Sequence, residues 1–202
     1  MKYIVRTVDF DPVRAQNVAR LKALIPGLIV VVDTKRDAYN GLFLACKEAE
    51  DTGAVILEDD VKLCRDFCAK VERVVADIGA DNVINFFEKP KSYFKSGFAG
   101  GSVFLWMQCT YFPPHFGGNL KEYYEEFKTL LPQKWRGQAV DCLTSYVLKK
   151  LKKKYYRYRP CLVQHLDYKS AIGPRPNNIQ SPYFIDDLEE KGISYEDLQP
   201  TK

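Results

Sequence analysis

Three consecutive carboxylates, Glu58, Asp59 and Asp60, are the residues of this sequence best suited to chemistry. They directly follow the apolar run Ala54–Leu57, which has the composition of a buried strand. Carboxylates held together repel one another, and partial burial penalises their charge further. A cation would relieve both effects, and oxygen ligands of this kind suit Mg²⁺ or Mn²⁺. The triplet therefore predicts a metal site, unless Asp59 or Asp60 simply caps the following helix while the other acids face solvent.

Alternating strands and helices surround this triplet over the first eighty residues. Asp11 and Pro12 form an N-cap signal, and Pro26-Gly27 stops the helix that they begin. The expected strands are Tyr3–Val8, Leu28–Val32 and Ala54–Leu57, and the expected helices cover 11–24, about 42–49 and 67–78. This order predicts an α/β fold with a doubly wound, mostly parallel sheet, whose strands at Leu28–Val32 and Ala54–Leu57 are buried on both faces. Ligands bind at the carboxyl ends of such strands, which is where Asp33 and the triplet fall.

The second half of the chain is less regular. Strands are expected at 83–87, 102–106 and 156–164, and helices at 119–130, where Asn119 would be the cap, and at 138–150. We expect one domain over 1–173, with a nucleotide-binding half (1–80) and an acceptor-binding, metal-completing half (81–173). The remaining residues, 174–202, are expected to form a wrapping tail.

The composition is that of a globular protein. The chain has 202 residues, of which 46% are hydrophobic and 13% aromatic, and no apolar stretch approaches the roughly 20 residues that span a bilayer. No secretion signal is expected from the first residues. The cysteines are scattered among apolar neighbours, as free buried thiols are. Cys64 and Cys68 lie one helical turn apart and could hold a metal, but no second Cys or His pair follows at the spacing of a zinc site. These features predict a soluble cytoplasmic protein without membrane insertion.

Positive charge is concentrated in one segment of the chain. The net charge is only +4, but residues 149–159 read KKLKKKYYRYR, with seven Lys or Arg and three interleaved tyrosines. Such a composition suits contact with a phosphate backbone. The alternative is a solvated helix end followed by an exposed strand face.

Several segments, in order, resemble GT-A glycosyltransferases. AVILEDDV with the preceding NGLFLACKEAEDTG resembles the acidic metal-binding region of that family, and GGSVFLWMQCTYF resembles its glycine-containing strand near the sugar and acceptor. WRGQAVDCLTSYVLKK is similar to the segment that supplies an acidic residue at a helix start, and PCLVQHLDYKSAIG to a late signature of small lipopolysaccharide-type transferases. The resemblance covers roughly residues 3 to 173.

The resemblance implies roles for individual residues. The metal would be held by Asp60 and His165, and Asp141 would be the general base if the reaction inverts the sugar. The nucleotide-sugar donor, by default a UDP-sugar, would be contacted by Asp33, Glu58, Asp59, Lys169 and Ser170. The acceptor would be contacted by Gly101, Trp106 and Tyr111. Simpler roles stay open for these residues: a packed side chain for His165, a helix cap for Asp141, a surface position for Lys169, and core packing for Trp106 and Tyr111.

The acceptor is the least determined feature. A small, basic transferase of this kind resembles those with which bacteriophages glycosylate hydroxymethylated pyrimidines in their DNA, with the segment 149–159 on phosphates and the target base flipped out. A lipopolysaccharide or another glycan is the alternative acceptor. A sugar nucleotidyltransferase is disfavoured because TVDFDPVRAQ, after the first strand, contains no glycine. A basic nucleic-acid-binding module without catalysis would leave the acidic triplet unexplained.

Overall fold

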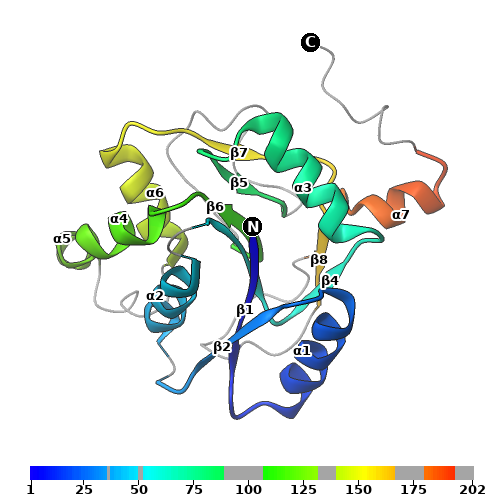
Figure 1. Cartoon of the computed structure of the whole chain (residues 1–202), viewed down its shortest axis with the longest axis horizontal. Helices are drawn as coiled ribbons and strands as arrows, with labels where there is room; N and C mark the ends of the chain where they lie inside the picture. Colours follow the sequence, from blue (N-terminus) through cyan, green and yellow to red (C-terminus); the bar gives the residue numbers. More distant parts are fainter. Residues whose placement is uncertain (36, 50–51, 89–106, 132–139, 167–179, 194–202) are drawn as a thin grey trace.

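The computed structural model describes the whole chain except residues 36, 50–51, 89–106, 132–139, 167–179 and 194–202 (Figure 1). The strands are β1 (Lys2–Val8), β2 (Ile29–Asp33), β3 (Ala54–Glu58), β4 (Val61–Leu63), β5 (Val83–Asn85), β6 (Cys109–Phe112), β7 (Tyr155–Arg157) and β8 (Val163–His165). The helices are α1 (Pro12–Leu24), α2 (Ala38–Ala49), α3 (Phe67–Ile78), α4 (Phe116–Glu122), α5 (Tyr124–Leu130), α6 (Val140–Lys150) and α7 (Ile185–Glu190).

Six strands form one mixed sheet in the order β2-β1-β3-β6-β5-β7. The pairs β1–β2, β1–β3 and β5–β7 are parallel, whereas β6 runs antiparallel to both of its neighbours. All strands of this sheet except β6 therefore point the same way. The predicted α/β fold with a mostly parallel sheet in a single domain is confirmed.

Helices cover both faces of this sheet (Figure 1). On one face, α1 and α3 pack with β1 and β3 in a cluster that contains Val18, Leu21 and Val71. On the other face, α2 packs with α4, α5 and α6 through residues such as Leu42 and Leu143. The doubly wound arrangement follows from the apolar stripe on each helix, which is buried only against a sheet face.

A second, two-stranded sheet lies beside the end of β3. β4 follows the acidic triplet and pairs antiparallel with β8, with Val61 opposite His165. The single strand expected at 156–164 is therefore wrong, because its two ends, β7 and β8, belong to different sheets. Periodicity within one segment does not specify which partner each end will find.

Other expectations also need correction. β2 is an edge strand with Val32 40% exposed, so this apolar run is not buried on both faces. Asn119 does not begin a helix but lies within α4, whose N-cap is His115, and α5 follows α4 as a separate helix. β6 lies within the segment GGSVFLWMQCTYF but after the strand that was expected there. The strand expected at 102–106 lies outside the described residues.

Two sequence-based expectations can be compared directly with the structure. All six cysteines are free thiols, and Cys46, Cys64, Cys109 and Cys161 are buried, as the apolar neighbours of the cysteines indicated. Among the described helices, none is both long and apolar enough to cross a membrane.

Candidate functional site

The acidic triplet forms a buried turn at the carboxyl edge of the main sheet. Glu58 is the last residue of β3, and Asp59 and Asp60 form the turn into β4. Asp59 and Asp60 are each only 2% exposed. We call Glu58, Asp59 and Asp60 the acidic turn. Burial of two adjacent carboxylates requires compensating donors or cations, and the neighbouring elements supply them.

Asp59 is bound through both carboxylate oxygens. Oδ1 accepts a hydrogen bond from the Arg14 guanidinium, and Oδ2 accepts one from Oγ1 of Thr7 at 2.7 Å. The side-chain amide of Asn17 also donates to the backbone carbonyl of Asp59 at 2.6 Å. Burial raises the pKa of Asp59 to about 6, with a smaller contribution from the charges of Asp60 and Glu58, and against the lowering effects of Arg14 and Thr7.

Arg14 is the buried cation of the acidic turn, and sequence reasoning missed it. Its guanidinium pairs with Oδ1 of Asp59 through Nη1 and with Oδ2 of Asp60 through Nη2, the latter at 3.2 Å. Arg14 is 5% exposed. Burial alone would lower its pKa, but the charges of Asp59, Asp60 and Glu58 raise it overall. A guanidinium suits this position because its planar donors can reach two carboxylates at once.

The start of α1 places Arg14 over the turn. The side chain of Asp11 caps the helix by accepting from the backbone N–H groups of Val13 and Arg14, as the N-cap signal predicted. The buried residues of α1 are Arg14, Asn17, Val18 and Leu21, a spacing of one helical face. Two polar residues on an otherwise apolar face indicate that this face meets buried polar groups, although they do not specify which groups.

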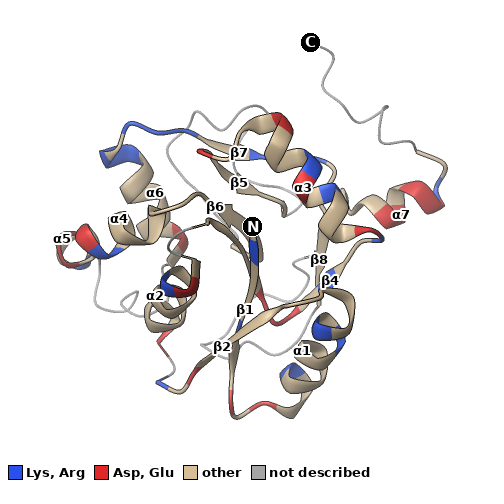
Figure 2. Ribbon diagram, in the orientation of Figure 1, with Lys and Arg blue, Asp and Glu red and all other residues tan. Residues whose placement is uncertain are grey.

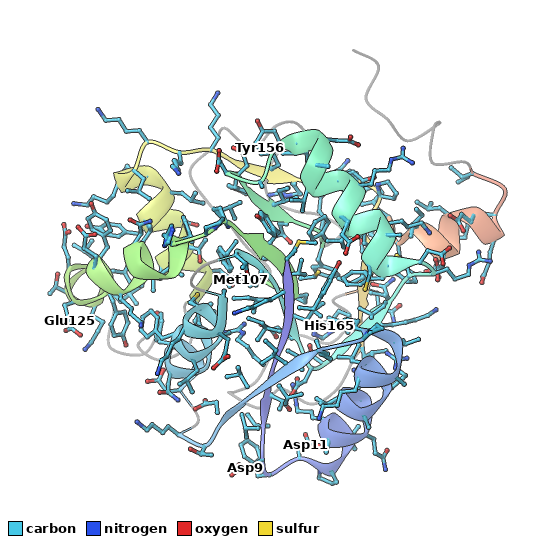
Figure 3. The ribbon with its side chains drawn as sticks, viewed as in Figure 1. Asp9, Asp11, Met107, Glu125, Tyr156 and His165 are labelled. Carbon is cyan, nitrogen blue, oxygen red and sulfur yellow. The ribbon has the colours of Figure 1, made fainter. Side chains whose placement is uncertain are left out.

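His165 lies against Asp60. Nε2 of His165 is 3.5 Å from Oδ2 of Asp60, and the imidazole is buried. The backbone N–H of Leu166 donates to the carbonyl of Asp60 at 2.7 Å, which fixes the end of β8 on the acidic turn. Figure 3 shows His165 on β8 and Asp11 at the start of α1, the two elements that flank the turn. The structure thus places His165 beside Asp60, although its role as a ligand stays a prediction.

The other acids at this edge bind protein groups. Glu58 pairs with Arg6 on β1 at 3.1 Å. The carboxylate of Asp33 accepts from the backbone N–H groups of Lys35 and Asp37 and from the amide of Asn40, and so shapes the loop before α2. Both residues lie at the expected edge of the sheet, and contact with a nucleotide stays a prediction for each.

The acidic turn as it stands does not fit a divalent metal. Among the described parts of the chain, no group of three or more His, Cys, Asp or Glu side chains is arranged to hold a metal ion. Both oxygens of Asp59 and Oδ2 of Asp60 are in contact with protein donors. Arg14 supplies positive charge to these acids from within the chain, a partner that the sequence-based expectation of a metal did not include.

Asp141 lies in the first turn of α6 and is partly exposed. Three residues further on, Thr144 donates to the sulfur of Met107 at 3.5 Å. Met107 precedes Gln108, whose carbonyl accepts from the backbone N–H of Glu58 at 2.9 Å. The start of α6 therefore lies at the same edge of the sheet as the acidic turn, and the role of Asp141 as a general base stays a prediction.

Tyr111 is not at this edge, and its assignment to the acceptor site needs correction. Tyr111 is 2% exposed and pairs with Val55, near the amino end of β3, and its hydroxyl donates to the carbonyl of Ala80 at 2.9 Å. Its large apolar ring is used in the core. The other expected contacts, Gly101, Trp106, Lys169 and Ser170, lie outside the described residues.

The basic segment 149–159 divides into two parts. Its two arginines pair with Glu88, which is 2% exposed: Arg157 at 3.1 Å, and Arg159 through both Nε and Nη2. Its lysines lie at the end of α6 and in the connection to β7, away from the turn between β3 and β4 (Figure 2). Because β7 is parallel to β5, this connection is at the amino edge of the sheet. The segment therefore does not border the acidic turn, and its contact with phosphates stays a prediction.

No protein-family model matches the chain, and no curated protein matches it. Among solved structures, it is similar to the crystal structure of A197 from STIV, with a TM-score of 0.43 and 14% identity over 91% of this chain and 96% of that chain. Similarity of this extent assigns neither a family nor an activity.

Proposed function

We propose that the protein is a GT-A-type glycosyltransferase that moves a sugar from a nucleotide-sugar donor, with a UDP-sugar favoured, to an acceptor hydroxyl. The observation that carries the proposal is the meeting of Asp60 with His165 at 3.5 Å. These residues belong to two motifs from opposite halves of the chain, both of which resemble segments of that family. Their convergence at the carboxyl edge of a mostly parallel sheet supports a shared ligand site.

The chemistry at this edge follows from its acids. In transfer with inversion, a carboxylate takes the proton of the acceptor hydroxyl as the anomeric carbon is attacked. Asp141 is the candidate because it is partly exposed in the first turn of α6, whereas Asp59 and Asp60 are buried and paired. We assign Glu58, which is only partly buried, to hydrogen bonds with hydroxyl groups of the donor, a task that suits carboxylate oxygens, and the buried Asp60 to holding the acidic turn in position. His165 would orient Asp60.

The acceptor hydroxyl belongs to a glycan or to a hydroxymethylated pyrimidine in DNA. The sequence favoured DNA because a small, basic transferase resembles those that act on phage DNA, and it assigned the phosphate contacts to the segment 149–159. Arg157 and Arg159 pair with Glu88, and the lysines lie at the amino edge of the sheet (Figure 2), so we propose no preference between the two acceptors. A non-catalytic nucleic-acid-binding module stays the alternative from another class, and it predicts DNA binding that neither needs a donor nor depends on Asp60.

The decisive experiment measures sugar transfer. The protein is incubated with UDP-glucose, UDP-N-acetylglucosamine or GDP-mannose together with glycan acceptors or hydroxymethylated DNA, and products are identified by mass spectrometry. Asp60→Asn is compared with Asp77→Asn, a matched change at an exposed residue of α3 that pairs only weakly with Arg73. We expect transfer from one donor, a loss of tenfold or more in Asp60→Asn, and no change in Asp77→Asn.

Two results would contradict the proposal. One is the absence of both transfer and donor-dependent stabilisation with every donor, since a ligand that binds only the folded state raises its stability. The other is DNA binding without a donor that is equal in the wild type and in Asp60→Asn, together with no transfer to that DNA from any donor. The second result would favour the nucleic-acid-binding module.

A further inference from the structure

The acidic turn contains its own cation. Arg14 bridges Asp59 and Asp60, and Arg6 pairs with Glu58. The three carboxylates carry a formal charge of −3, and the two guanidinium groups reduce the formal charge of the turn to −1. Most of the electrostatic attraction that would draw in a divalent ion is therefore already satisfied inside the fold.

The geometry also opposes a metal ion. Nη2 of Arg14 lies 3.2 Å from Oδ2 of Asp60, so a metal bound to that oxygen would face a buried positive charge. The other guanidinium nitrogen and Thr7 are bound to Asp59. A divalent ion could bind both carboxylates only if the guanidinium of Arg14 moved away from them. The positive charge of Arg14 would then be buried without a carboxylate of the acidic turn beside it.

Arg14 is built into this position by several contacts. Its backbone N–H is bound by the helix cap Asp11, whose carboxylate also lies 3.5 Å from Nε of Arg14. Asn17, one turn further along the same helix, donates to the backbone carbonyls of Asp59 and Val61. Arg20 donates to the carbonyl of Val61 at 2.9 Å. One face of α1 is thus committed to the acidic turn, and release of Arg14 would require this face to shift.

We propose that Arg14 takes the place of a divalent cation at the acidic turn, so that the turn binds no metal and donor binding is metal-independent. The second part rests on the proposed glycosyltransferase function, whereas the first part does not. The inference departs from the sequence-based expectation of Mn²⁺ or Mg²⁺.

The test of the first part uses Mn²⁺ alone. Binding is followed by the loss of the free-ion signal in electron paramagnetic resonance, and stability by the melting temperature with Mn²⁺ or with EDTA. We expect no specific binding and no change in melting temperature for the wild type. In Arg14→Gln the carboxylates lose their partner, so we expect a lower melting temperature in EDTA and a rise of roughly 5–10 °C when Mn²⁺ is added.

Two controls separate this effect from general charge loss. Arg14→Lys keeps the cation and should remain insensitive to Mn²⁺. Lys22→Gln removes a positive charge from the last turn of the same helix and should respond as the wild type does. Saturable Mn²⁺ binding by the wild type that Asp60→Asn abolishes would overturn the proposal, and this measurement stands even if Arg14→Gln does not fold. A folded Arg14→Gln that gains no response to Mn²⁺ would also overturn it.

The second part is tested with the donor identified by the transfer assay. We expect the same stabilisation by the donor, and the same transfer rate, in Mn²⁺ and in EDTA. A loss of tenfold or more in EDTA would overturn metal independence while leaving the transferase proposal intact. A failure of every donor would instead contradict the transferase proposal, and the Mn²⁺ experiment would still decide the role of Arg14.

Discussion

Nε2 of His165 lies 3.5 Å from Oδ2 of Asp60, although β8 and the turn after β3 belong to opposite halves of the chain. The pairing of β4 with β8 creates this relationship, because it sets Val61 opposite His165 and leaves Asp60 next to the imidazole. A two-stranded sheet thus joins the two ends of the candidate site. Both side chains are buried, so any change in one affects the position of the other.

His165→Ala is expected to lower kcat/KM for sugar transfer by tenfold or more, which corresponds to about 1.4 kcal/mol of transition-state stabilisation. The cause would be the loss of the group that orients Asp60. His165→Gln retains a nitrogen donor and should recover part of the activity. Steady-state kinetics on the wild type and both variants, with circular dichroism as a check of folding, would measure this. Equal activity in all three proteins would show that His165 is only a packed side chain.

Asp59 makes the stability of the protein pH-dependent. Because its pKa is raised from 3.8 in the unfolded state to about 6 in the folded state, the folded protein holds a proton that the unfolded chain has already released. The contribution of Asp59 to the free energy of unfolding is therefore full below pH 3.8 and is lost as the pH rises through about 6. A tenfold difference in proton affinity between the folded and unfolded states corresponds to about 1.4 kcal/mol of stability.

Urea denaturation of the wild type and Asp59→Asn between pH 4 and 7 would measure this effect. The stability of the wild type relative to Asp59→Asn should fall as the pH rises, because the asparagine cannot titrate. Asp77→Asn, at an exposed position, provides the comparison for ordinary charge removal. A difference between the wild type and Asp59→Asn that is constant over this range would rule out the raised pKa.

Glu88→Gln is expected to destabilise the fold by about 3–5 kcal/mol, because it leaves two guanidinium groups without the buried carboxylate that neutralises them. Arg157 is the more affected partner, since its side chain is 9% exposed. Glu125→Gln is the matched control. Glu125 is exposed and its partner Lys128 is partly exposed, so this ion pair contributes less than about 1 kcal/mol to stability. Urea unfolding of both variants would provide the two values. Similar losses in the two variants would contradict the structural role of Glu88.

Two adjacent glycines of α4 should respond oppositely to alanine. A Cβ at Gly117 would lie 2.4 Å from Cβ of Cys46, so α2 and α4 would have to separate, at a cost of about 1–3 kcal/mol. A Cβ at Gly118 would meet nothing within 4 Å, and alanine should stabilise the helix there by up to about 1 kcal/mol. Thermal unfolding of the two variants should therefore move in opposite directions. Equal shifts would contradict the close packing of α2 against α4.

The sequence by itself determined the local structure of the first half of the chain. The Asp11-Pro12 signal predicts the start of α1, and the run from Ala54 to Leu57 predicts β3, because capping and hydrophobic patterning act between residues close in sequence. The position of the acidic turn at a strand end follows from the same pattern. These features place the candidate site at the carboxyl edge before any tertiary contact is known.

Only the tertiary structure decided what surrounds that turn. The pairing of Arg14 with Asp59 and Asp60 joins α1 to the end of β3, and the segment 156–164 divides between two sheets. Neither follows from periodicity, because a charged residue on a helix face gives no indication of its partner, and a strand pattern does not specify its neighbour. Tyr111 likewise has an aromatic ring suited to stacking on a sugar, but packing places it in the core. The sequence thus determined where the acids lie, and long-range packing determined that a guanidinium of the same chain neutralises them.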